Sequence, residues 1–213
     1  MNTARPDQPA RRLARAVRGL PAWRADWGRA MTAELAAIES PAERTTFARS
    51  AAGAAIRLGW AVRVSIVVGV ALLSGLGVLV GSRLQLEADG PGLLAVSVPL
   101  PALLLLAGGL VAAQHERSAL RGLAIGAIAA VTTAVVVLGM LAAEGLTWMS
   151  RLGVYALDRE PPRGDVTPGD IALDVFTTGM WMGHAVLWVI GLGVGVLLGA
   201  FLSRGPEGAL TAR

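Results

Sequence analysis

Four long stretches of the sequence contain no Asp, Glu, Lys or Arg, namely residues 64–82, 90–115, 122–143 and 175–203. A helix needs about 20 apolar residues to cross the hydrocarbon core, and backbone in lipid must form its hydrogen bonds within its own segment. Each stretch can therefore cross a membrane once as a helix, and none shows the alternation of a barrel strand. We predict an all-α integral membrane bundle of four transmembrane helices, with spans at about 60–82, 93–114, 120–143 and 177–202.

The composition agrees with a lipid environment and argues against several kinds of chemistry. Of the 213 residues, 54% are hydrophobic and only 16% are charged, whereas a soluble domain carries about a quarter charged residues. The sequence has no cysteine and two histidines, which excludes thiol chemistry and disfavours a histidine metal site. The glycine-rich run at 191–199 is not a dinucleotide loop, because it lies inside an apolar span with no strand before it. We expect no catalysis, metal or cofactor.

Arginine positions predict the orientation. All 19 basic residues are arginine, a lysine-free composition typical of a GC-rich bacterial genome. Residues 1–63, 114–121 and 204–213 hold 15 of them, and the loops on the other side, 82–92 and 144–174, hold four. Arginine-rich loops stay on the cytoplasmic side, and four crossings also return the chain to the side on which it began. We predict a multi-pass protein of the bacterial cell membrane with both termini in the cytoplasm.

The charged residues before the first span are expected to form a cytoplasmic amphipathic helical hairpin. Its apolar face follows helical spacing and consists of Trp23, Trp27, Met31, Leu35 and Ile38. Ser40, Pro41 and Glu43 then form a capping box that starts a second helix, directed towards the first span. Three arrangements of the apolar face are open: it lies on the inner leaflet, it packs on the second helix, or it binds another protein.

Two short motifs follow one another in this segment. They are W-x-x-A-M-x-A-E-L-x-x-I at Trp27 to Ile38 and E-R-x-x-F-A at Glu43 to Ala48. Together they resemble a juxtamembrane segment of small actinobacterial four-helix membrane proteins, many uncharacterised and some encoded beside transcriptional regulators or sigma factors. The resemblance implies a regulatory role. Zinc-binding anti-sigma domains use His and Cys ligands, and this segment has neither, so any sigma-factor link would be metal-free.

Two ionisable residues mark a candidate intramembrane polar site. His184 lies about seven residues inside the last predicted span, roughly 10 Å below the outer surface. Glu144 lies at the outer end of the third predicted span. Ionisable groups within spans are commonly functional, so the pair would serve a proton-linked site if the two helices are neighbours. The structural alternative is a neutral His184 bonded to a backbone carbonyl, with Glu144 among the lipid headgroups.

Small residues recur at every fourth position in two predicted spans. They are Gly122 and Gly126 in the third span, and Gly191, Gly195 and Gly199 in the fourth. Helices in lipid associate through close backbone packing rather than through hydrophobicity, and such stripes permit it. We predict that these glycines are packing faces, either within the bundle or between two copies of the chain.

These observations define the domains and the function that we expect. The domains are a cytoplasmic N-terminal helical segment at 1–57, a four-helix transmembrane domain at 58–203 and a cytoplasmic tail at 204–213. We expect a regulatory or accessory membrane protein that acts through its N-terminal helices. Its expected partners are the lipid bilayer, a cytoplasmic protein at residues 21–57 and further copies of the chain, and not nucleic acid. The alternative is a small transporter or transporter subunit with a polar site near His184 and Glu144.

Overall fold

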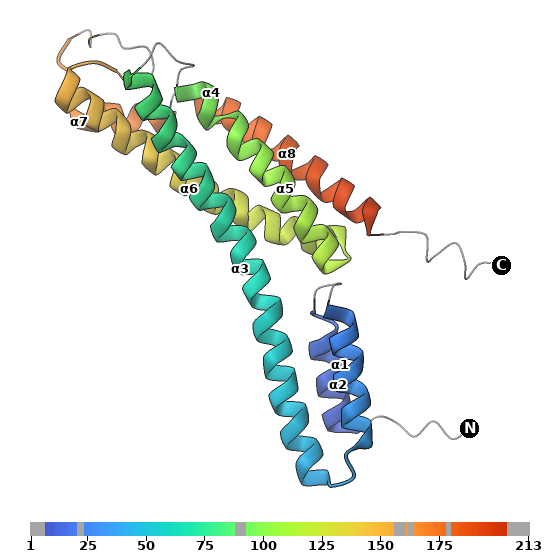
Figure 1. Ribbon diagram of the computed structural model, residues 1–213. Coiled ribbons are helices and arrows are strands. Elements are labelled where there is room, and N and C mark those ends of the chain that lie inside the picture. Colours follow the sequence, from blue (N-terminus) through green and yellow to red (C-terminus); the bar gives the residue numbers. More distant parts are fainter. Residues whose placement is uncertain are drawn as a thin grey trace. The chain divides into compact units, whose positions relative to one another are not determined.

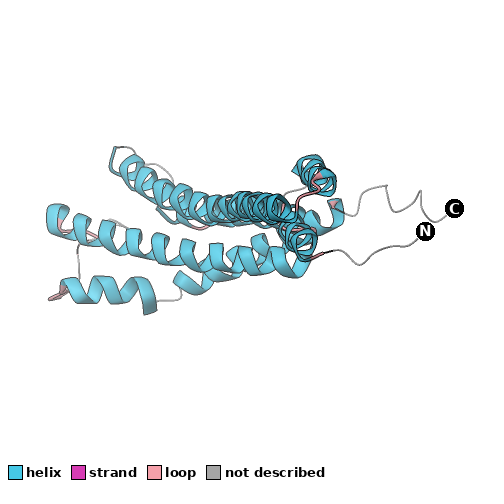
Figure 2. Cartoon of the chain, turned by 90° about the horizontal axis from the view of Figure 1, so that it is seen from below, coloured by secondary structure: helices cyan, strands magenta, loops and turns pink. Residues whose placement is uncertain are grey.

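The computed structural model describes residues 7–20, 24–87, 93–155, 161, 164–177 and 180–203. Within these ranges the regular structure is entirely helical, as Figure 2 shows. The helices are α1 (Gln8–Val17), α2 (Ala25–Ala37), α3 (Pro41–Glu87), α4 (Leu93–Ser97), α5 (Pro99–Glu116), α6 (Ala119–Leu152), α7 (Pro168–Thr177) and α8 (Met180–Leu202).

The chain divides into two compact units, Met1–Ser65 and Ile66–Arg213. We call them the N-terminal unit and the C-terminal unit. The division falls inside α3, which is an unbroken helix of 47 residues. The sequence predicts the boundary at residue 57, where charge gives way to apolar residues. The helix carries the N-terminal packing about two turns beyond that point.

Three helical segments of the described chain are long and apolar enough to cross a membrane: Pro41–Gln85, Ala119–Leu152 and Gly183–Leu202. They contain the predicted spans at 60–82 and 120–143, and the third of them overlaps the predicted span at 177–202 from Gly183 onwards. The predicted span at 93–114 is not one helix, because α4 ends at Ser97 and α5 begins at Pro99. The ring of Pro99 clashes with a continuing helix and its nitrogen cannot donate a hydrogen bond. The break thus lies at Pro99, the first of two prolines in this predicted span.

Local sequence explains where the helices of the N-terminal unit begin. The Asp7 carboxylate accepts a hydrogen bond from the Ala10 N–H at 2.8 Å and so caps α1. The Ser40 hydroxyl accepts one from the Glu43 N–H at 3.5 Å, at the start of α3 that the capping box predicts. Helix α1 was not predicted from the sequence. Its signal is an Asp cap followed by Pro9, which suits the first turn of a helix.

The C-terminal unit is built around α5. This helix packs mainly on α8 and also on α6, and α7 packs on α6; Figure 1 shows α5 lying along α8. A single buried cluster joins residues of α3, α5, α6 and α8, among them Val78, Leu105, Val137 and Leu192. Large apolar side chains also cover the outside of these helices; Val135 of α6 and Leu197 of α8 are each 69% exposed. An apolar exterior of this kind is what lipid requires and water does not favour.

Candidate functional site

The apolar face predicted for residues 21–38 is used inside the N-terminal unit. Met31 and Leu35 of α2 are 7% and 1% exposed and pack with Leu13 of α1 and Ala48 of α3. Trp27 is half-buried against the same cluster, Ile38 is partly buried, and Trp23 lies outside the described residues. This face therefore packs within the unit, on α1 as well as on residues of α3. Met31 and Leu35 are therefore not a free docking surface.

Arg44 connects the three helices of this unit. Its Nη1 donates to the carbonyls of Leu35 and Ile38, the latter at 3.0 Å, at the C-terminal end of α2. Its Nη2 and Nε donate to Asp7 at 2.9 and 3.1 Å, at the start of α1. A guanidinium at a helix C-terminus satisfies carbonyls that have no partner within the helix. The second motif of the sequence, E-R-x-x-F-A, thus contains the residue that fixes the α2–α3 corner.

The pKa of Asp7 lies below its ordinary value of 3.8. The main cause is the hydrogen bond from the Ala10 backbone, and the hydrogen bond from Arg44 adds to it, with a smaller contribution from the charge of Arg11. All three favour the ionised carboxylate. Asp7 therefore remains charged, and the contact with Arg44 remains intact, down to mildly acidic pH.

Glu144 is held by residues of α3, which the sequence did not indicate. Its Oε2 accepts a hydrogen bond from the Ser82 hydroxyl at 2.5 Å, and its Oε1 forms a 2.9 Å salt bridge with Arg83. The Ser82 oxygen in turn accepts the indole N–H of Trp148 at 3.0 Å. Glu144 is only 5% exposed. A serine, an arginine and a tryptophan thus supply the polar surroundings that water would otherwise provide.

His184 is 2% exposed and lies on α8 beside the α4–α5 break. Its Nε2 lies 3.1 Å from the Ser97 hydroxyl. The ring meets Trp188 edge to face at a centroid distance of 5.6 Å, and the Trp188 indole donates to the Val98 carbonyl at 3.1 Å. The contacts of His184 are thus made by α4 and α8, whereas those of Glu144 are made by α3 and α6. The structure does not assemble the two residues through these contacts into one site.

The predicted glycine stripes pack within the chain. A Cβ atom on Gly191, Gly195 or Gly199 would lie 2.4, 2.0 or 2.4 Å from a backbone oxygen of α5, in each case one turn further along. Those oxygens belong to Ala102, Leu106 and Leu110. Gly122 approaches the backbone of Ala113 in the same way, and Gly126 accommodates the side chain of Leu192. These contacts account for the stripes without a second copy of the chain.

The described part of the chain has no group of three or more histidine or acidic side chains placed to hold a metal ion. No protein-family model matches the sequence, and no curated protein or solved structure matches it. What the protein does must therefore be inferred from its own residues.

Proposed function

We propose that the chain is a multi-pass protein of the bacterial cell membrane with a regulatory or accessory role. It acts through the N-terminal unit on the cytoplasmic side of the membrane and performs no catalysis. The four-helix topology predicted from the sequence supports this placement, because 15 of the 19 arginines fall on the side that carries the N-terminal unit. The resemblance of residues 27–48 to juxtamembrane segments encoded near regulators points to the same role.

The observation that carries the proposal is the length of α3. Its 47 residues correspond to about 70 Å of helix, more than twice the roughly 30 Å thickness of the hydrocarbon core. The N-terminal part of α3 supplies Ala48 and Ala51 to the core of the N-terminal unit, while its later part is apolar enough to cross a membrane. We therefore propose that one helix serves both as a structural part of a charged unit and as a membrane span.

The span predicted at 93–114, which is the second along the chain, is proposed as a broken helix made of α4 and α5. Helix α5 alone has 18 residues, about 27 Å, which is close to the hydrocarbon thickness. Irregular backbone at membrane depth is tolerated where protein covers it. At the break, the Val98 carbonyl accepts a hydrogen bond from the Trp188 indole at 3.1 Å, and Ser97 is fully buried.

A photo-crosslinking experiment tests the regulatory proposal. Ala36 is exposed on α2, whereas its near neighbour Met31 is buried in the unit's core. A photoreactive residue at position 36 in native membranes is expected to capture a cytoplasmic protein, and one at position 31 to label only the chain itself. Deletion of residues 1–57 should abolish the biological effect, while the remaining chain still inserts. Exclusive labelling of lipid or self from position 36 would argue against the proposal.

A second function, a small transporter or a subunit of one, is favoured by the buried polar groups of the C-terminal unit. Besides Glu144 and His184, the hydroxyls of Ser74 and Thr133 are fully buried, and neither has a hydrogen-bond partner within the described structure. Such groups are costly in an apolar interior and commonly mark bound water or a polar path. Glu144→Gln or His184→Ala should then abolish proton-linked uptake into vesicles while α5 and α8 remain packed. Unchanged uptake in both variants would remove this alternative.

A further inference from the structure

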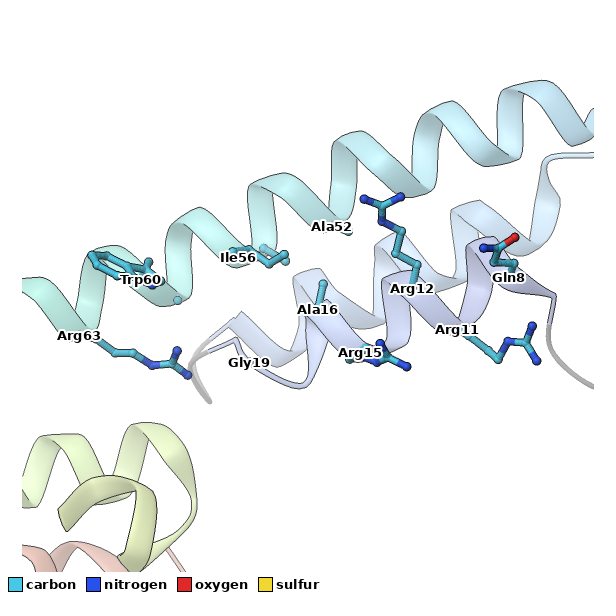
Figure 3. Close-up of a pocket in the computed structure, with 12 residues that line it drawn as sticks. Gln8, Arg11, Arg12, Arg15, Ala16, Gly19, Ala52, Ile56, Trp60 and Arg63 are labelled. Carbon is cyan, nitrogen blue, oxygen red and sulfur yellow. The ribbon is translucent and has the colours of Figure 1, made fainter. Parts of the chain in front are cut away.

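A pocket of about 520 Å³ lies between α1 and the first half of α3, entirely within the N-terminal unit. Twelve residues line it, and Figure 3 shows them. Four of the twelve are arginines, three from α1 and one from α3, and none of the twelve is acidic: Arg11, Arg12, Arg15 and Arg63. Pockets of this size accommodate small molecules or headgroups. The lining makes this a cationic pocket.

The spacing along α1 explains why the arginines face the pocket. Gln8, Arg11, Arg12 and Arg15 recur at steps of three, one and three, which places them on one side of a helix. Leu13 is fully buried in the unit's core on another side of α1. Helix α1 therefore presents separate apolar and basic sides. In Figure 3, Arg12 reaches from α1 towards α3, and Arg63 extends from α3 towards Gly19 at the end of α1.

A close backbone contact fixes one end of the pocket. A Cβ atom on Gly59 would lie 2.7 Å from the carbonyl oxygen of Gly19. Only glycine at position 59 allows the end of α1 to come this near to α3. Both residues line the pocket. The pocket therefore depends on the backbone contact between α1 and α3 and not on side-chain rotamers alone.

Apart from Arg63, the wall that α3 contributes is apolar, and its large side chains are exposed. Ile56 and Trp60 line the pocket and are 57% and 63% exposed, and Val64, one turn further along α3, is also exposed. From there α3 becomes uncharged and apolar enough to cross a membrane. A ligand in this pocket therefore meets guanidinium groups on one side and, on the other, an apolar wall that leads towards the span. Tryptophan at such a position suits the membrane interface.

We propose that this pocket binds the phosphodiester headgroup of an anionic membrane lipid, with an acyl chain against Ile56 and Trp60. Guanidinium groups form strong, often bidentate hydrogen bonds with phosphate oxygens. Basic clusters immediately beside a transmembrane helix attract anionic lipids, and each arginine near the surface strengthens the attraction. A free phosphate ion would use the arginines but not the apolar wall. The wall therefore favours a lipid as the source of the phosphate group.

The test measures lipid binding to the full-length protein in detergent by native mass spectrometry. Short-chain phosphatidylglycerol, phosphatidylcholine and inorganic phosphate are the probes. The pocket variant is Arg12→Gln with Arg63→Gln. The matched control is Arg49→Gln with Arg57→Gln, which removes the same charge from exposed positions on α3 that do not line the pocket. Thermal unfolding of each variant checks that the fold is intact.

The pocket variant should weaken phosphatidylglycerol binding about tenfold or more, and the control less than about threefold. Phosphatidylcholine should bind weakly to every form. A second experiment needs no substitution. In the unmodified protein, phosphatidylglycerol with a diazirine on its acyl chain should label the peptide that contains Ile56 and Trp60. Equal weakening by the two variants, equal affinity for phosphatidylcholine, or labelling that avoids this peptide would overturn the proposal. Displacement of the lipid by equimolar inorganic phosphate would instead identify a site for a free anion and would equally overturn it.

Discussion

The two units hold their helices together by different means. In the N-terminal unit, α1, α2 and α3 meet through side chains of ordinary size such as Leu13, Met31 and Leu35, and a charged side chain, Arg44, fixes the corner. In the C-terminal unit, α5 and α8 meet backbone to backbone through Gly191, Gly195 and Gly199. This is the difference that we expect if the N-terminal unit lies in water and the C-terminal helices lie in lipid. Water drives apolar side chains together, whereas lipid gives them no reason to leave it, and so close packing must hold the helices.

The largest expected effect is that of Gly195→Val. The first added carbon would lie 2.0 Å from the Leu106 carbonyl oxygen, so α8 must move away from α5. We expect a loss of about 3 kcal/mol or more, at the upper end of overpacking effects because the obstacle is backbone. Thermal unfolding in detergent measures it. Gly193→Val is the matched control on the same helix, since a Cβ there has no neighbour within 4 Å; an equal loss in that variant would show that the stripe is not a packing face.

Leu35→Ala should cost the N-terminal unit about 2–3 kcal/mol, because Leu35 is 1% exposed in its core and truncation leaves a cavity. The matched variant is Leu103→Ala, which truncates the same type of side chain at a position of α5 that is 64% exposed. If lipid surrounds Leu103 in both the folded and the separated helices, its truncation should change stability little. Hydrogen exchange, followed separately in residues 7–65 and 93–203, measures both. A comparable loss in the two variants would contradict the proposed difference between the units.

Arg44→Gln should loosen the α2–α3 corner by about 1.5 kcal/mol, because charged hydrogen bonds to Asp7 and to the α2 carbonyls are lost. Faster proteolysis between residues 37 and 44 is the expected readout. Arg49→Gln removes the same charge from an exposed position of α3 and should leave the cleavage rate unchanged. If both variants were cleaved equally fast, net charge rather than the corner contact would be responsible.

The smallest expected effect is the pH response of the α1 cap. The folded state lowers the pKa of Asp7, so the stabilisation from its carboxylate is complete above the unfolded value and is lost as pH falls through the lower folded value. The structure therefore predicts that α1 is unaffected at neutral pH and loosens only below about pH 4. A carboxyl carbon NMR titration of labelled Asp7 reports the midpoint. It should rise towards 3.8 in the Arg44→Gln variant, and an unchanged midpoint would refute the contact's electrostatic role.

Sequence reasoning identified elements whose signal is local. Charge-free stretches located the apolar helices, and the Ser40–Pro41–Glu43 pattern located the start of α3, because both depend on neighbouring residues. The break in the predicted second span also has a local cause in Pro99.

Contacts between residues far apart in the sequence could not be predicted in the same way. The hydrogen bond from Ser82 to Glu144 joins positions 62 residues apart, and neither residue alone specifies the other. The glycine stripe of α8 was recognisable as a packing face, but its partners on α5 depend on how the helices cross. The apolar face of α2 could equally have met lipid, protein or its own chain, and only the position of α1 and α3 decides among these.

We propose that the N-terminal unit lies in the cytoplasm and that the C-terminal helices lie in lipid. Because the sequence has no cysteine, a single introduced cysteine is the only thiol that a maleimide can label. Ala36→Cys on exposed α2 and Val135→Cys on the 69% exposed outer face of α6 provide the comparison. A membrane-impermeant maleimide should label Ala36→Cys in inside-out vesicles but not in intact cells, and should label Val135→Cys in neither. Labelling of Ala36→Cys from outside intact cells, or rapid labelling of Val135→Cys, would contradict this placement of the two units.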